Sequence, residues 1–173
     1  MRNLEIKTRP RDWDRVEAGL ATLGAERQGE LVQHDIFYRA LDGRLKLRLT
    51  PDGCGELIHY HRNDAARIRR SEYTLVQVRD GAGLTRLLDA ALERCGEVHK
   101  TRILYRVDNV RVHLDVVRGL GRFLEVEAVV DARHSERDCR AAAARVLACC
   151  GITPRQHLAA AYVDMRPRRR PGG

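Results

Sequence analysis

Charged side chains recur at every second residue in several segments of this chain, and that alternation constrains the fold more than any other feature. Lys46 and Arg48 in RLKLRL are separated by one apolar residue, and so are Glu125 and Glu127 in FLEVEAVV. In a β-strand, residues i and i+2 point to the same face. Each of these segments therefore predicts a strand with one charged and one apolar face.

Several such runs, separated by turn-forming residues, predict a strand-rich domain. The predicted strands are Leu4 to Lys7, LVQHDIFYRAL, RLKLRLT, GELIHYHR, SEYTLVQVR, HKTRILYRV, VRVHLDVV and RFLEVEAVV. The predicted helices are RDWDRVEAGLATLG, Gly83 to Cys95, Glu136 to Cys150 after the N-cap Ser135, and a short one opened by Thr153-Pro154. The fold class is therefore α+β, with about eight antiparallel strands and helices at the breaks.

Two architectures satisfy this pattern. One is an open antiparallel sheet with a solvated face and helices on the apolar face. The other is a β-barrel whose interior is the polar face and whose apolar outer face is covered by helices. Two details favour the barrel. The charged faces differ in sign from strand to strand, and all three lysines of this arginine-dominated chain, Lys7, Lys46 and Lys100, fall on them.

The charged faces suit phosphate and metal chemistry. The basic candidates are Lys7, Lys46, Arg48, Lys100 and Arg102, which could surround a polyphosphate with charge-assisted hydrogen bonds. The acidic candidates are Glu5, Asp115, Glu125 and Glu127, whose hard oxygen ligands suit Mg²⁺ or Mn²⁺. A divalent ion between carboxylates and phosphate oxygens stabilises the charge that develops as a P–O bond breaks. The chain contains no Walker A loop, so a P-loop enzyme is excluded.

The order of these segments resembles the CYTH family, which comprises class IV adenylyl cyclases and thiamine triphosphatases and is also called the triphosphate tunnel metalloenzymes. NLEIK stands in the place of the N-terminal ExExK motif, GRLKLRL resembles the basic LRxR-type strand, and HKTR resembles the KxR strand. VHLDVVRGLGRFLEVE resembles the paired-glutamate segment, and AYVDM the closing segment of the cyclase-like branch. The resemblance covers residues 1 to about 165.

The resemblance implies an eight-stranded antiparallel tunnel with helices outside, which binds triphosphates with one or two divalent ions. It assigns Glu5, Glu125 and Glu127 to the metal, with Asp115 as an additional candidate ligand, and the basic candidates to the phosphates. Glu5 joins the basic candidates as the expected catalytic set. Further substrate contacts are expected from His59, Glu72 and His113. For His59, an ordinary strand histidine near the barrel mouth is the competing interpretation.

The implied activity is class IV adenylyl cyclase-like conversion of ATP to cyclic AMP and pyrophosphate, a phosphorus-oxygen lyase reaction. The alternatives are a triphosphatase acting on thiamine triphosphate or inorganic tripolyphosphate, a repurposed enzyme for a diphosphate metabolite, and a non-catalytic nucleotide- or polyphosphate-binding module. One departure motivates the last of these. The first glutamate of ExExK is Asn3 here, and an amide oxygen can coordinate a metal but carries no charge.

Composition sets the remaining expectations. The 173 residues predict one domain, residues 1–165, and the Arg-rich 166–173 are expected to be a disordered basic tail. The N-terminus lacks an apolar signal-peptide core and no transmembrane run occurs, so a cytoplasmic location without membrane contact is predicted. Aromatic residues make up only 5%, which disfavours a nucleic-acid partner. The expected partner is a phosphorylated small molecule, and a homodimer is left open. The five cysteines contain no CxxC pair and predict buried reduced thiols.

Overall fold

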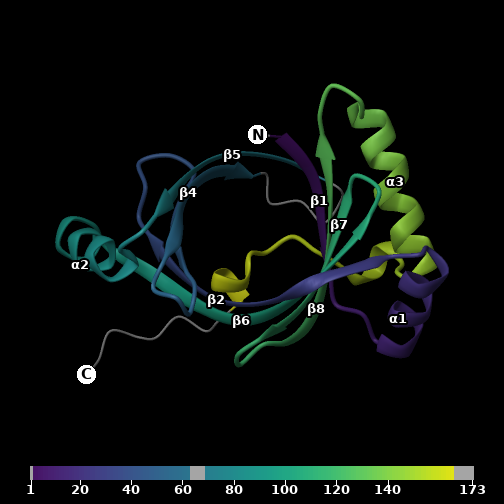
Figure 1. Cartoon of the computed structure of the whole chain (residues 1–173), viewed down its shortest axis with the longest axis horizontal. Helices are drawn as coiled ribbons and strands as arrows, with labels where there is room; N and C mark the ends of the chain where they lie inside the picture. Colours follow the sequence, from purple (N-terminus) through teal and green to yellow (C-terminus); the bar gives the residue numbers. More distant parts are fainter. Residues whose placement is uncertain (1, 63–68, 166–173) are drawn as a thin grey trace.

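The computed structural model describes residues 2–62 and 69–165 and shows a closed barrel with helices outside (Figure 1). The strands are β1 (Arg2–Thr8), β2 (Glu26–Tyr38), β3 (Arg44–Leu49), β4 (Gly55–Arg62), β5 (Arg69–Val78), β6 (Arg94–Val107), β7 (Val110–Val117), β8 (Gly121–Val130) and β9 (His157–Leu158). The helices are α1 (Trp13–Thr22), α2 (Gly81–Ala91) and α3 (Glu136–Cys149), with 3₁₀ turns η1 (Pro154–Gln156) and η2 (Tyr162–Met165). The tail predicted for 166–173 lies outside the described residues.

The sheet closes on itself, which decides between the two architectures in favour of the barrel. Its strand order is β5-β4-β3-β2-β6-β7-β8-β1-β9, and β1 also pairs with β5. Every pairing that involves β1 to β8 is antiparallel, so these eight strands form the ring and the short β9 adds to β1 beside it. The predicted α+β barrel is thereby confirmed.

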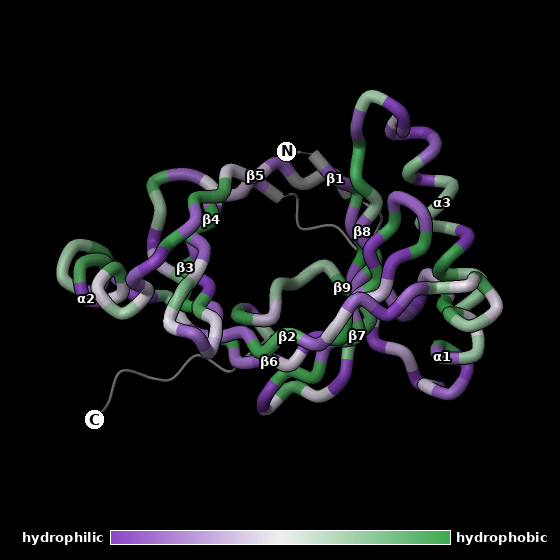
Figure 2. The backbone as a smooth tube through the Cα atoms, viewed as in Figure 1, coloured by the Kyte–Doolittle hydropathy of each residue, from purple (hydrophilic) through white to green (hydrophobic). Residues whose placement is uncertain are grey.

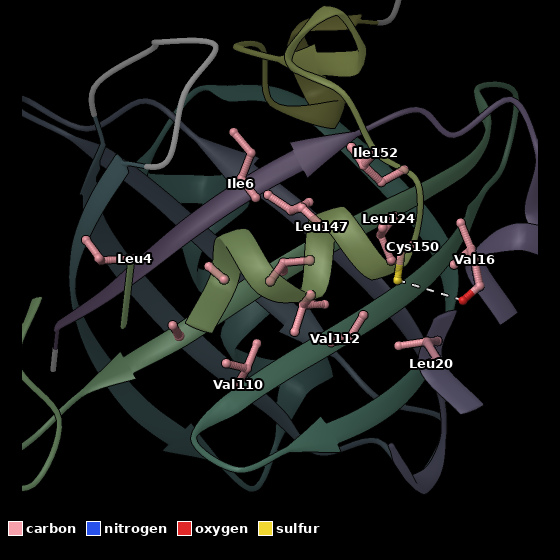
Figure 3. Packing of buried hydrophobic residues seen from close by; sticks show 14 of the residues in the cluster. Leu4, Ile6, Val16, Leu20, Val110, Val112, Leu124, Leu147, Cys150 and Ile152 are labelled. Carbon is pink, nitrogen blue, oxygen red and sulfur yellow. Dashed lines mark hydrogen bonds between the residues drawn. The ribbon is translucent and has the colours of Figure 1, made fainter. Parts of the chain in front are cut away.

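Helices α1 and α3 cover the outer face of β1, β7 and β8. Leu4 and Ile6 of β1 alternate with the charged residues of that strand and are buried in a cluster with Val16 of α1 and Leu147 of α3 (Figure 3). The Cys150 thiol, just beyond α3, donates to the Val16 carbonyl at 3.8 Å. Burying this apolar face outside the ring leaves the charged face pointing inward.

Helix α2 covers the outer face on the opposite side of the ring (Figure 1). Leu88 of α2 packs against Ile36 and Tyr38 of β2 and Leu47 of β3. The Tyr38 hydroxyl donates to Asp89 at 3.0 Å, which satisfies its polar end. The hydropathy of the chain follows this arrangement, with green and purple alternating along the strands (Figure 2).

The start and end of α2 differ from the prediction of Gly83 to Cys95. The helix begins at Gly81, because the Asp80 side chain accepts a hydrogen bond from the Gly83 amide as its N-cap. It ends at Ala91, and β6 begins at Arg94, earlier than the predicted HKTRILYRV run. The reason is the long β2, whose Tyr38 pairs with Arg94 and holds that segment extended.

One end of the barrel is filled by an apolar cluster. Phe37, Val98, Val117 and Phe123 pack there against Tyr162 of η2. Figure 1 shows this yellow C-terminal segment inside the ring. Because neighbouring strands are antiparallel, the C-terminal ends of β2 and β7 lie beside the N-terminal ends of β6 and β8. These four side chains therefore lie at the same end of the barrel.

The predicted thiol state is confirmed, although burial is not uniform. All five cysteines are free, with Cys139 and Cys150 buried but Cys95 and Cys149 exposed. Within residues 2–62 and 69–165, no helix has the length and apolar composition required to cross a membrane.

The contact between α1 and α3 depends on Gly19. A Cβ atom at this position would lie 2.4 Å from the Cys149 carbonyl oxygen, which is backbone and cannot rotate away. We expect Gly19→Ala to lower the free energy of unfolding by about 1–3 kcal/mol, measured by urea denaturation. Glu17→Ala, at an exposed position of α1, is the control and should change stability by less than about 0.5 kcal/mol. Equal stability of the two variants would contradict this packing.

Candidate active site in the barrel

The barrel encloses a cavity of about 340 Å³ lined by side chains from all eight strands of the ring and from the C-terminal segment. Most of the predicted site residues line it, namely Glu5, Lys7, Lys46, Arg48, Lys100, Arg102, His113, Glu125 and Glu127. The strand alternation therefore brings both the basic and the acidic candidates to one enclosed space. Its walls differ in character around the ring, and three sectors can be distinguished.

The basic sector lies on β3, β2 and β6, which are neighbours in the ring. Its centre is Asp35 of β2, only 3% exposed, which the sequence analysis did not single out. Asp35 accepts from Lys46 Nζ at 3.2 Å and from Arg48 Nε at 2.8 Å, and Lys100 Nζ lies 3.8 Å away. Although burial raises the pKa of Asp35, Arg48 and the two lysines hold it well below its ordinary value.

The cations of this sector outnumber its carboxylates, and their pKa values reflect it. Burial and Arg48 lower the pKa of Lys46. Burial and Arg102 lower the pKa of Lys100 to about 7. A lysine with such a pKa regains a full charge when an anion approaches, so the sector is suited to anion binding.

Arg102 is held by a buried carboxylate on the inward face of β7, the face that also carries Arg111 and His113. Asp115 is fully buried and accepts from Arg102 Nε and Nη2, both at 2.6 Å, and from the Tyr162 hydroxyl at 2.9 Å. Despite its burial, Arg102 and Lys100 lower the pKa of Asp115 to about 2. Asp115 does not line the cavity. The structure therefore places this predicted metal ligand where it orients Arg102 and Tyr162 instead.

The acidic sector lies on β8 and β1. Glu5 is paired with Glu127 across the two strands, and Lys7 with Glu125. Like charges in directly opposed positions repel each other. Burial, reinforced by Glu125 and Glu5 and opposed by Arg111, raises the pKa of Glu127. Glu125 differs, because Lys7 and Arg102 outweigh its burial and hold its pKa well below the ordinary value.

The chemistry of this sector fits a hard divalent cation. It offers the carboxylates of Glu5, Glu125 and Glu127, and a cation beside Glu127 would stabilise its ionised form. Asn3 donates through Nδ2 to Glu127, while its buried Oδ1 has no hydrogen-bond partner among the described residues. An amide oxygen is also a suitable ligand for such an ion.

The acidic sector is not preassembled as a compact cluster. Within the described part of the chain, no three of its carboxylates bring their oxygens within 4.8 Å of one another. The reason is competition from arginine, because Arg102 Nη2 lies 2.9 Å from Glu125 and Arg111 Nη2 lies 3.0 Å from Glu127. Each of these arginines contacts a single oxygen of its carboxylate, Oε2 of Glu125 and Oε1 of Glu127.

The third sector, on β4 and β5, is apolar and aromatic. Ile58 is paired with Leu75, and Tyr60 with Tyr73, and all four side chains line the cavity. Glu56 is the acidic residue of β4 that reaches the cavity, 3.6 Å from Arg48. This sector separates β1 from β3 around the ring, so the acidic and basic sectors each border it.

Two predicted substrate contacts lie elsewhere. Because Ile58 and Tyr60 face the cavity, His59 points outward, and its Nε2 lies 2.8 Å from the Asp42 carbonyl oxygen. Because Tyr73 faces the cavity, Glu72 points outward and is exposed. In both strands apolar residues occupy both faces, since Leu57 of β4 and Val78 of β5 pack outside the ring near α2 while Ile58 and Leu75 line the cavity.

Among the cavity residues that the sequence analysis did not single out, Asp35, Arg111 and Tyr162 make the most charge and hydrogen-bond contacts. Asp35 shares a face with Gln33 and Phe37, and Arg111 lies two residues before His113, so alternation could have found both. Tyr162 stands in the AYVDM segment, but its contact with the site could be seen only in the folded structure. Its ring centroid lies 3.7 Å from Lys7 Nζ. Burial raises the pKa of Tyr162 well above its ordinary value, so it remains a hydrogen-bond donor.

Fold and cavity together define a class: an antiparallel tunnel barrel with facing basic and acidic walls. The chain belongs to the CYTH family, whose domain matches residues 1–158. A search of curated protein sequences finds no significant match.

Solved structures share the fold at low sequence identity. A protein from Pyrococcus horikoshii OT3 is 20% identical with a TM-score of 0.83, and covers 94% of this chain and 98% of its own. A candidate adenylate cyclase from Vibrio parahaemolyticus is 19% identical with a TM-score of 0.72, over 94% and 95%. A candidate adenylyl cyclase from Hippeastrum with a dominant triphosphatase activity is 13% identical with a TM-score of 0.64, over 92% and 90%.

Proposed function

We propose that this protein is a divalent-metal-dependent enzyme that cleaves a P–O bond of a nucleoside triphosphate inside the barrel. The observation that carries this proposal is the facing of a basic and an acidic sector across one cavity inside the barrel. Family membership supports it, because the named structural neighbours include a candidate cyclase and a protein with triphosphatase activity.

The basic sector would bind the phosphates. Lys46 and Arg48 project into the cavity from β3, and Lys100 and Arg102 project from β6, on the other side of β2. Their donors are charged and partly desolvated, which strengthens hydrogen bonds to phosphate oxygens. Arg102 is fixed by its bidentate contact with Asp115, so its guanidinium would contribute with little loss of side-chain entropy. Lys7, above the Tyr162 ring, would approach the same phosphates from β1.

The acidic sector would hold the metal through Glu5, Glu125 and Glu127, with Asn3 Oδ1 as a neutral ligand. When bound, Mg²⁺ or Mn²⁺ would stabilise the negative charge that develops on the phosphate oxygens. Positioning and electrostatics would supply most of the catalysis. His113 also lines the cavity, and burial together with Arg102 holds its pKa well below the ordinary value, so it would act as a neutral donor or acceptor.

The apolar sector favours an organic triphosphate over inorganic tripolyphosphate. Ile58, Leu75, Tyr60 and Tyr73 offer surface for a base or sugar, whereas an inorganic chain would leave it without a complementary group. A ribose 3′-hydroxyl attacking the α-phosphorus would release pyrophosphate and leave a cyclic nucleotide, the class IV cyclase-like reaction that we favour. Water attacking the terminal phosphorus would instead release orthophosphate.

Product identification tests the proposal and separates the two reactions. Nucleoside triphosphates, thiamine triphosphate and tripolyphosphate would each be incubated with the protein and Mg²⁺ or Mn²⁺. Cyclic AMP with pyrophosphate from ATP would support cyclisation, and orthophosphate would support hydrolysis. If no substrate is consumed with either metal, the enzymatic proposal is wrong.

Asn3 favours a second candidate, a module that binds nucleotides without turning them over. An amide at this position cannot hold a metal as tightly as a carboxylate and cannot act as a base. In that case ATP would bind without turnover, and Asn3→Glu should raise turnover by at least about tenfold by adding a charged ligand. Higher activity in the wild type than in Asn3→Glu would exclude this candidate.

The pKa of Lys100 predicts a pH dependence of phosphate binding. Its pKa of about 7 means that the charged form is complete well below pH 7 and is lost as the pH rises through 7. A bound polyphosphate favours the charged form, so its affinity should fall above pH 7, by up to about tenfold per pH unit. Tripolyphosphate titrations of the wild type and of Lys100→Arg without metal would measure this. The arginine variant remains charged, so an identical slope in both proteins would contradict the assignment.

A further inference from the structure

Two histidines and a glutamate meet on the outer face of the barrel, away from the cavity. Gln33 and Asp35 face the cavity, so His34 between them faces outward from β2. On β6, Val98 and Lys100 face the cavity. Glu97 and His99 therefore face outward beside His34, because side chains alternate along a strand.

The strand register brings the three side chains together. His34 is paired directly with His99, and Glu97 lies two residues earlier on the same face of β6. Each residue offers one ligand atom, and these atoms all lie within 4.8 Å of one another. No other three His, Cys, Asp or Glu residues in the described ranges, 2–62 and 69–165, meet this condition. The side chains are 29%, 42% and 36% exposed for His34, Glu97 and His99, so an ion can reach them from solvent.

We propose that His34, Glu97 and His99 form a site that binds Zn²⁺ or a similar divalent transition-metal ion. Two imidazoles and a carboxylate suit Zn²⁺, Ni²⁺ or Cu²⁺ rather than Mg²⁺, which prefers oxygen ligands alone. Zinc with three protein ligands completes its tetrahedron with water.

The three ligand atoms lie within 4.8 Å of one another, somewhat wider than a closed zinc site requires. Ligand atoms about 2.0–2.1 Å from a tetrahedral zinc lie roughly 3.4 Å apart. His34 Nε2 lies 3.0 Å from Glu97 Oε2, and His99 Nε2 lies 3.7 Å from Glu97 Oε1. The two rings are stacked with their centroids 3.9 Å apart and their planes 15° from parallel. Each histidine already lies within 4 Å of a Glu97 oxygen, and rotation of the two imidazole rings out of their stacked arrangement would direct both nitrogens at one ion.

Neighbouring arginines set the charge of this site. Arg94 Nη1 lies 4.0 Å from Glu97, but the guanidinium of Arg94 also binds Asp89, with Nη2 2.6 Å from its carboxylate. Arg118 lines the same surface hollow as His34 and His99. A zinc ion with its bound water therefore needs the Glu97 carboxylate as its counter-charge, and Glu97 is as important as either histidine.

An ion here would tie β2 to β6 directly behind the basic sector of the cavity. His34 precedes Asp35, and His99 precedes Lys100, in the two strands that the ion would join. The expected consequence is a more stable barrel wall, and it does not depend on the proposed enzymatic activity.

Zinc titration by calorimetry tests the site. The full chain would be titrated with Zn²⁺ in an excess of Mg²⁺, which occupies oxygen-ligand sites. We expect one zinc per chain, and a dissociation constant at least about tenfold weaker in His34→Ala, His99→Ala and Glu97→Gln. His134→Ala, which removes an exposed histidine that contacts Asp131, is the matched control and should bind like the wild type.

Two further measurements keep the test decisive. Zinc should raise the thermal midpoint of the wild type and of His134→Ala but not of His99→Ala, while the metal-free midpoints show that each variant folds. Co²⁺ should give a tetrahedral absorption spectrum without thiolate bands in the wild type, and this spectrum should be lost in His99→Ala. The proposal is overturned if zinc does not bind, if the histidine variants bind it as tightly as the wild type, or if Cys95→Ser abolishes binding.

Discussion

Replacing Glu127 by glutamine is expected to lower metal-dependent turnover by on the order of 100-fold or more. Glu127 lies opposite Glu5, and its raised pKa reflects burial and repulsion from Glu5 and Glu125. A divalent cation bound between these carboxylates would offset their repulsion, and it is attracted to Glu127 by the negative charge of that side chain. Glutamine keeps the size of the side chain but removes that charge, so the concentration of Mg²⁺ or Mn²⁺ that gives half-maximal activity should also rise.

Glu72→Gln is the matched control for this experiment. Glu72 was predicted from sequence to contact the substrate, but it is exposed on the outer face of β5. We expect the kcat/KM and the metal dependence of the Glu72→Gln variant to equal those of the wild type. The location of the metal site is wrong if Glu127→Gln retains normal activity and metal dependence, or if Glu72→Gln loses activity to the same extent.

Replacing Asp115 by alanine is expected to lower the free energy of unfolding by about 3–5 kcal/mol. Asp115 is fully buried, and its removal leaves the Arg102 guanidinium and the Tyr162 hydroxyl without their main acceptor. Arg102 would keep its contact with Glu125, but its Nε donor would lose its acceptor in a buried environment where water cannot replace it. Urea denaturation would measure the loss, and the m-value would show whether the transition remains two-state.

An exposed ion pair with the same separation provides the control. Arg39 Nε lies 2.6 Å from Glu93, as Arg102 Nε lies from Asp115, but both side chains of the exposed pair are more than 60% accessible. Glu93→Ala should therefore cost less than about 1 kcal/mol. If Asp115→Ala costs no more than Glu93→Ala, burial of the Asp115 network does not stabilise the fold.

The experiments on Asp115 and Glu127 separate two roles that the sequence analysis merged. Both carboxylates were predicted as metal ligands because each alternates with apolar residues in a strand. Glu127 lines the cavity, whereas Asp115 is fully buried and bound to Arg102 and Tyr162. We therefore expect Asp115→Ala to affect mainly stability and Glu127→Gln mainly catalysis.

The period-two charge pattern was sufficient to predict that β1, β3 and β8 are strands with one charged and one apolar face. In these strands polar and apolar residues alternate, so the apolar face is the one buried under the helices, and closure of the ring then turned the charged face inward. Lys46 and Glu125 illustrate this, because exposing Leu47 or Leu124 instead would have left large apolar side chains in water. Local chemistry was therefore enough to identify which residues share a face.

What the sequence could not determine is the orientation of strands that are apolar on one face and mixed on the other. In β4, Ile58 and Tyr60 alternate with Leu57 and His59, and either set could face inward. Closure of the ring decided this, since β4 pairs with β3 in the register that places Ile58 beside Lys46. The pairing of His34 with His99 has the same origin, because only the antiparallel register of β2 and β6 brings residues 65 positions apart within reach of one ion.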